Sequence, residues 1–185
     1  EDARRLIAPV EDEVRKLLGR HIFAVDDETM EDAVGRLLSD QSKTIAVYED
    51  LTGGLVAERL QQASVDYFVQ GIVGNSHTAA RRLLARSGRS DGIEELLDDP
   101  ASLTDELARA VRAEAGSDLG LALHAITNPK EQVENLARGQ TFISITDGSG
   151  HKNRTYAYGG RGRPDRTRMS LNAIELVRIA LIEGI

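Results

Sequence analysis

The sequence contains no cysteine and no tryptophan, and it has only 3 phenylalanines and 4 tyrosines in 185 residues. The absence of cysteine excludes a disulfide scaffold, a thiolate metal site, an iron–sulfur cluster and a cysteine nucleophile. Because aromatic side chains are scarce, the core must be built from aliphatic residues. We therefore expect a protein of a reducing, cytoplasmic compartment that carries no cofactor.

The chain also lacks long apolar segments. No run approaches the roughly 20 apolar residues that a membrane-spanning helix needs, and no basic start precedes an apolar stretch. The formal net charge is −7, which repels nucleic-acid phosphates and anionic lipids. The segment Arg161-Gly162-Arg163-Pro164 is similar to the core of a motif that inserts into the minor groove of DNA. Because the match is four residues long and the whole molecule is acidic, we do not interpret it as a DNA-binding motif. We expect neither nucleic acid nor membrane as a partner.

The length and the hydrophobic fraction of 41% fit one globular domain with a short appended segment. The first residue is Glu1, which we interpret as a sign that the chain is a piece of a longer protein. Residues 1–40 predict a helical connector. Its first helix carries apolar residues at helical spacing, and its second, over 28–39, begins with a capping-box pattern at Thr29 and Asp32.

Residues 41–185 predict an α/β domain, because short β-rich runs alternate with longer helical segments. We expect a three-layer α/β/α sandwich with a mixed, mostly parallel sheet. A hairpin is predicted across the turn sequence Asp147-Gly148-Ser149-Gly150, and Thr104 is expected to cap a helix that starts at Asp105. The expected strands are 44–48, 67–73, 119–123, 141–146 and 153–158, and the expected helices are 53–63, 105–115 and 168–182.

The loop after the first strand carries the most informative motif, Tyr48-Glu49-Asp50-Leu51-Thr52-Gly53-Gly54. It joins the carboxyl end of a strand to the start of a helix, where unpaired backbone N–H groups and the helix dipole favour an anion. The two glycines allow such a group to approach closely. A phosphate or a carboxylate suits this position, although a tight βα turn is an equally good interpretation.

The motif resembles the A-E-S-C-T-G-G sequence of the CinA C-terminal domain family, the nicotinamide-nucleotide amidohydrolases. Further family motifs are matched in the same order along the chain, and residues 23–38 are similar to the connector that precedes this domain in full-length CinA proteins, so upstream CinA domains are expected in the parent chain. The matching segments are 48–60, 70–84, 101–108, 117–129 and 138–143.

The resemblance implies hydrolysis of the amide of nicotinamide mononucleotide, with a serine nucleophile and a lysine base. In this chain those two positions hold Asp50 and Ala80, the family tyrosine is replaced by Asn75, and the glycine-rich loop has become 125–129. An alanine cannot accept a proton, and a carboxylate is a poorer nucleophile than a serine hydroxyl. We therefore expect a catalytically degenerate domain.

Ligand binding can persist without catalysis. The resemblance implies Glu49, Thr52, Gly53, Gly54, Asn128 and Arg166 as ligand-binding residues, with a small-molecule nucleotide as the ligand. For Glu49, anchoring the loop through backbone N–H groups is the preferred interpretation. A purely structural role in assembly is the other alternative. The apolar face of the first helix must be covered by its own domain or by a second copy, which favours a homodimer.

A rebuilt hydrolase site is a further alternative. Asp50, His77 and His124 replace a serine, an asparagine and a threonine of the family motifs. If the strand ends converge as the resemblance implies, two imidazoles and a carboxylate meet, and this is a common ligand set for zinc or another divalent metal. Separate hydrogen-bonding histidines on loops are the alternative to a metal site.

Overall fold

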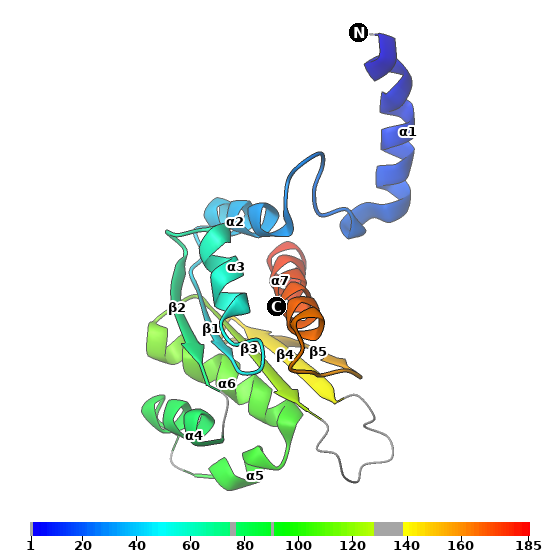
Figure 1. Ribbon diagram of the computed structural model, residues 1–185. Coiled ribbons are helices and arrows are strands. Elements are labelled where there is room, and N and C mark those ends of the chain that lie inside the picture. Colours follow the sequence, from blue (N-terminus) through cyan, green and yellow to red (C-terminus); the bar gives the residue numbers. More distant parts are fainter. Residues whose placement is uncertain (1, 75–76, 90, 128–138) are drawn as a thin grey trace.

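The computed structural model describes residues 2–74, 77–89, 91–127 and 139–185 and shows helices on both faces of a central sheet (Figure 1). The helices are α1 (Asp2–Leu18), α2 (Met30–Gln41), α3 (Leu55–Ala63), α4 (His77–Arg86), α5 (Ile93–Leu97), α6 (Pro100–Ala115) and α7 (Arg163–Glu183), with a short 3-10 turn, η1 (Gly19–His21). The strands are β1 (Ile45–Glu49), β2 (Phe68–Val73), β3 (Leu119–Ile126), β4 (Gln140–Thr146) and β5 (His151–Tyr156).

The sheet is mixed, with the strand order β2-β1-β3-β4-β5. The strands β2, β1 and β3 run parallel to one another, and β4 and β5 form the predicted antiparallel hairpin beside them. This architecture confirms the expected α/β sandwich. The parallel part of the sheet places the carboxyl ends of β1, β2 and β3 at one edge, where ligands bind in open α/β sheets.

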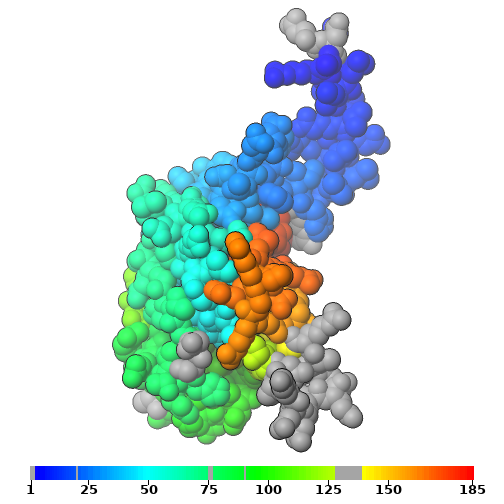
Figure 2. All heavy atoms as spheres, in the orientation of Figure 1, coloured from blue at the N-terminus to red at the C-terminus, as the bar shows by residue number. Residues whose placement is uncertain are grey.

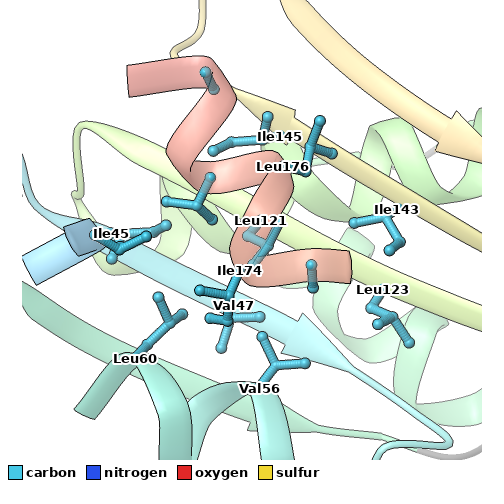
Figure 3. Packing of buried hydrophobic residues seen from close by; sticks show 14 of the residues in the cluster. Ile45, Val47, Val56, Leu60, Leu121, Leu123, Ile143, Ile145, Ile174 and Leu176 are labelled. Carbon is cyan, nitrogen blue, oxygen red and sulfur yellow. The ribbon is translucent and has the colours of Figure 1, made fainter. Parts of the chain in front are cut away.

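Two cores lie on the two faces of the sheet, and β1 contributes to both. Ile45 and Val47 pack into the cluster formed with α2, α3 and α7, and Figure 3 shows them beside side chains of α3, α7, β3 and β4. Ala46 and Tyr48 point to the other face, where α4 and α6 cover the sheet. All these residues of β1 are buried, as expected for a central parallel strand with covered faces.

The two helices at the beginning of the chain behave differently. α2 packs against α3 and α7, and its Val34 and Leu38 are fully buried. In contrast, α1 projects from the body (Figures 1 and 2), and among the described residues it contacts only η1. Leu6 and Leu17 of α1 are each 77% exposed. Of the two predicted covers for the apolar face of α1, its own domain does not provide one here, and a second copy stays a prediction.

Helix starts were predicted with mixed success. The capping box at α2 is confirmed, because Thr29 Oγ1 accepts from the backbone N–H of Asp32 and the Asp32 carboxylate accepts from the backbone N–H of Thr29. The expected cap at Thr104 is wrong. α6 starts earlier, at Pro100, because the Asp99 side chain accepts the backbone N–H groups of the first turn and proline is favoured at the first helical position.

The ends of two other elements also differ from the sequence prediction. β3 continues to Ile126, so that His124 lies within the strand and pairs with Phe142 of β4. α7 begins at Arg163 instead of Arg168.

In the described part of the chain, no helix combines the length and the apolar character that crossing a bilayer requires.

Candidate functional site

Glu49, the last residue of β1, holds the start of α3. Its carboxylate is fully buried and accepts hydrogen bonds from the backbone N–H groups of Val56 at 3.1 Å and Ala57 at 2.8 Å. These donors belong to the first turn of the helix and have no partner within it. Gly54, the residue at the N-cap, has no side chain to serve them. Glu49 thus anchors α3. Its carboxylate lies at the N-terminus of this helix, where the sequence predicted an anionic ligand.

The turn between β1 and α3 is closed by an arginine from α7. Arg166 donates to the backbone oxygen of Thr52 from Nε at 3.0 Å and from Nη2 at 2.5 Å. Its guanidinium lies over Gly53, where an added Cβ would stand 2.7 Å from Nη2. Gly53 and Gly54 have φ values of +65° and +102°, which favour glycine. The side chain of Arg166 therefore stabilises the turn by binding the backbone oxygen of Thr52.

Thr52 itself lies inside this turn. Its hydroxyl oxygen is buried and has no hydrogen-bond partner among the described residues. Thr52 is buried, whereas Gly53 is exposed and Gly54 is half-buried. A ligand-binding role of these three residues stays a prediction.

Asp50 stands one residue beyond β1 and forms hydrogen bonds to the end of β3. Its side chain is 7% exposed, and its carboxylate oxygens lie 3.1 and 3.2 Å from the backbone nitrogen of Ala125. The backbone N–H of Leu51 also donates to it. Asp50 Oδ2 lies 2.6 Å from Nδ1 of His124. The register explains the contact, because Glu49 pairs with Leu123 and the next residues of the two strands are neighbours.

These two side chains line a cavity of about 460 Å³ at the carboxyl edge of the parallel strands. The wall next to α4 carries Ala80, whose methyl group is buried at the position where the resemblance implies a base. Tyr48 donates its hydroxyl to the backbone oxygen of Gly74 at 3.0 Å, and burial raises the pKa of this tyrosine above its ordinary value. The ionisable residues that line the cavity are Tyr48, Asp50, His77, Asp98, His124 and Arg161.

The predicted meeting of Asp50, His77 and His124 is found only in part. Asp50 and His124 form a direct hydrogen bond, and His77 lies at the start of α4 in the wall of the same cavity. Within the described ranges, no group of three histidine, cysteine, aspartate or glutamate residues can hold a metal ion. The alternative prediction of a metal site with three ligands is therefore wrong for the described residues, and only the contact between Asp50 and His124 is found. The sheet brings two strand ends together, but it leaves His77 on a neighbouring helix.

Two predicted positions, Asn75 and Asn128, lie outside the described residues. Asp98 and Arg161 also line the cavity, although no sequence motif marks either of them. Asp98 follows a short helix in a polar segment and carries no motif. Arg161 belongs to a basic stretch, and nothing in its spacing indicates which of the arginines faces the cavity.

A family model described as the CinA C-terminal domain matches residues 27–181 of this chain. The "CinA-like protein" of Acaryochloris marina is 31% identical over 186 residues, covering 98% of this chain and 44% of that protein. The "Putative competence-damage inducible protein" of Moorella thermoacetica is 35% identical over 152 residues, covering 78% of this chain and 35% of that protein. The chain thus spans less than half the length of these curated relatives.

Solved structures share the fold at lower identity. A CinA superfamily protein of Klebsiella pneumoniae has a TM-score of 0.65 and 21% identity, and the alignment covers 83% of this chain and 94% of that one. A CinA superfamily protein of Escherichia coli has a TM-score of 0.66 and 16% identity, with coverage of 91% and 98%. Together with the family model and the sequence relatives, this agreement shows that the chain belongs to the CinA C-terminal domain family.

Proposed function

We propose that this CinA C-terminal domain binds a small nucleotide in the 460 Å³ cavity and does not hydrolyse the amide of nicotinamide mononucleotide. The observation that carries the proposal is the chemistry of two positions. Asp50, at the position of the family's nucleophile, is a carboxylate engaged by backbone N–H groups and by His124. Ala80, at the position of the family's base, offers a methyl group to the cavity.

The loss of amide hydrolysis follows from these side chains. The serine–lysine mechanism needs a hydroxyl that loses its proton to an amine as it attacks. Neither group is present at Asp50 and Ala80. Removing members of such a unit lowers the rate by on the order of 10⁴-fold or more. We therefore expect ammonia release to be lower by at least that factor than in a family member with both residues.

Nucleotide binding is supported by the size of the cavity and by the arginine in its lining. Its volume of about 460 Å³ lies within the range of roughly 300–1,000 Å³ that is usual for small-molecule sites. Glu49 accepts from the backbone N–H groups of Val56 and Ala57, and Arg166 donates to the backbone oxygen of Thr52, so these groups at the α3 turn are already engaged. Arg161 is exposed, lines the cavity and has no ion pair with any described residue. We place the phosphate of the nucleotide at Arg161.

Two measurements test this proposal. Ammonia release from nicotinamide mononucleotide should be absent at protein concentrations that give rapid turnover with an intact family member. Calorimetry should detect binding of nicotinamide mononucleotide, and saturation at about one hundred times the dissociation constant should add about 2.7 kcal/mol to the free energy of unfolding. Arg161→Gln should weaken this binding, whereas Arg163→Gln, an exposed neighbour outside the cavity lining, should not. Family-level turnover, or no binding heat at millimolar nucleotide, would contradict the proposal.

We also propose that α1 pairs with α1 of a second copy. Ile7, Val10, Val14 and Leu17 repeat at alternating spacings of three and four, which is the pattern of a two-stranded coiled coil, and all four are exposed. Light scattering after size exclusion should give the mass of a dimer for the wild type and of a monomer for Val10→Glu. A monomeric wild type would indicate that another domain of the parent chain covers this face.

A further inference from the structure

The hydrogen bond between Asp50 and His124 resembles the contact that orients a catalytic histidine, and nothing in the CinA serine–lysine chemistry uses it. We propose that the Asp50–His124 dyad is a general base that activates water, and that the cavity hydrolyses small carboxylic esters that carry a negative charge. This inference goes beyond nucleotide binding. It rests on the hydrogen bonds and the cavity walls described above.

The hydrogen bonds of Asp50 determine which nitrogen of His124 carries the proton. Leu51 and Ala125 donate their backbone N–H groups to the carboxylate, so the carboxylate acts as an acceptor. Its third close contact, His124 Nδ1 at 2.6 Å, must then be the donor. In the neutral ring the proton therefore lies on Nδ1, and Nε2 keeps a lone pair that can accept a proton.

The surroundings of the ring hold it in place. His124 is part of β3, and its ring stacks with Phe142 of β4 at a centroid distance of 6.4 Å and an interplanar angle of 25°. The side chain keeps 16% of its surface accessible and lines the cavity. A ring that is held by a carboxylate at Nδ1 and lines a cavity is placed for general-base catalysis.

Water is the nucleophile that this site can use. Asp50 is engaged by backbone donors and by His124, and Tyr48 donates its hydroxyl to Gly74. As water oxygen forms a bond to the carbonyl carbon of the ester, its proton passes to Nε2 of His124. The tetrahedral intermediate then breaks the bond to the alcohol oxygen, which takes the proton from Nε2. The products are a carboxylic acid and an alcohol, and no redox step occurs.

The charge and the reactivity of the cavity select the substrate class. Among the described lining residues Arg161 is the cationic one and Asp50 and Asp98 are the acidic ones, so a negatively charged group on the substrate is favoured beside Arg161 and not elsewhere in the cavity. An ester suits the site better than an amide because an alcohol is a much better leaving group than an amine. A single general base supplies on the order of 10²–10⁴-fold in rate, which is sufficient for activated esters.

Ester hydrolysis tests the proposal with an anionic probe, mono-p-nitrophenyl glutarate, and a neutral one, p-nitrophenyl acetate. Both His124→Gln and Asp50→Asn should lower kcat/KM for the anionic ester by about 10²-fold or more. The matched control is His151→Gln, because His151 also contacts an aspartate, Asp105 at 3.3 Å, but lies outside the cavity lining. Equal rates for the wild type, His124→Gln and His151→Gln would overturn the proposal.

A second pair of variants tests the substrate class. Arg161→Gln should remove the preference for the anionic ester over the neutral one, and Arg163→Gln should leave the preference unchanged. If Arg161→Gln keeps the preference, the negatively charged substrate class is wrong. This result is independent of nucleotide binding, because the ester probes contain no nucleotide.

The wild-type protein offers a test that does not depend on the folding of any variant. Imidazole ¹⁵N spectra should show His124 as the tautomer with its proton on Nδ1. Asp50→Asn can present its amide N–H₂ to the ring and should shift the proton to Nε2, which separates positioning of the ring from a merely structural role. A neutral wild-type His124 with its proton on Nε2 would overturn the dyad.

Discussion

Replacing Glu49 by glutamine tests whether this residue anchors α3 or binds a ligand. The substitution keeps the size of the side chain and removes its charge. The carboxylate accepts from two backbone N–H groups, those of Val56 and Ala57, inside the protein. A glutamine can present its oxygen to only one of these donors, and its amide N–H₂ then faces the other. The variant therefore leaves a buried N–H group without a partner.

The expected effect on stability has two parts. Losing one hydrogen bond to a buried charged acceptor costs about 1.5–3 kcal/mol. Removing a negative charge from a helix N-terminus costs about 0.3–1 kcal/mol more. We expect Glu49→Gln to lower the free energy of unfolding by about 2–4 kcal/mol, which corresponds to a fall in Tm of roughly 5–15 °C for a domain of this size.

Urea unfolding followed by circular dichroism measures the effect. The matched control is Glu58→Gln. It makes the same substitution at an exposed residue of the first turn of α3, the turn that Glu49 binds from β1. We expect the control to change the free energy of unfolding by less than about 0.5 kcal/mol. A Glu49→Gln protein that is as stable as the control but has lost nucleotide binding would refute the anchoring role and make Glu49 a ligand residue.

Further predictions concern the packing and the pH dependence of the fold. Gly35→Ala should destabilise the domain by at least about 1–3 kcal/mol, because the added Cβ would stand 1.9 Å from the backbone oxygen of Ala63 and push α2 away from α3. Leu121→Ala, in the centre of β3, should cost about 2–5 kcal/mol through the cavity that it leaves. Hydrogen bonds from Thr44 lower the pKa of Asp118 below its ordinary value of 3.8, so its contribution is present above that pH and is lost as the pH falls through the lowered pKa. Asp118→Asn should therefore be less stable than the wild type at pH 7, and the difference in the free energy of unfolding should shrink as the pH falls below 3.8.

Chemical unfolding checks all three variants. An unchanged midpoint for Gly35→Ala would mean that the two helices can separate without loss. A difference between Asp118→Asn and the wild type that does not shrink as the pH falls below 3.8 would show that the carboxylate charge is not the source of the stabilisation. For Leu121→Ala, a loss below about 1 kcal/mol would mean that the core around β3 closes the gap.

The expected class of fold is confirmed because its signals are local. Alternating apolar runs and helical periodicities depend on neighbouring residues, and they place β1, β2, β3 and the hairpin within a few residues of their observed bounds. The capping box at Thr29 and Asp32 is equally local, since both partners lie within one helical turn. The failed prediction at Thr104 also has a local cause, because Asp99 is a stronger cap and stands just before a proline.

The candidate site was predictable only as a region. The motif around Asp50 and the strand before His124 indicate the carboxyl edge of a parallel sheet, where chemistry in α/β folds takes place. The sequence does not say that these two side chains form a hydrogen bond, because they are 74 residues apart and meet only through the register of β1 with β3. Arg161 lines the cavity because of the path that the chain takes into α7, and the sequence does not show this path.

The sequence by itself determined the class of fold, the acidic charge, and the presence of Asp50 and Ala80 where the resemblance implies a serine and a lysine. The tertiary structure decided how the retained polar residues are used. Glu49 turns inward to the N-terminus of α3, Arg166 closes the turn, and Asp50 binds His124. These partners lie on different elements, and only the packing of the elements into one sheet and its helical layers brings their atoms within hydrogen-bonding distance.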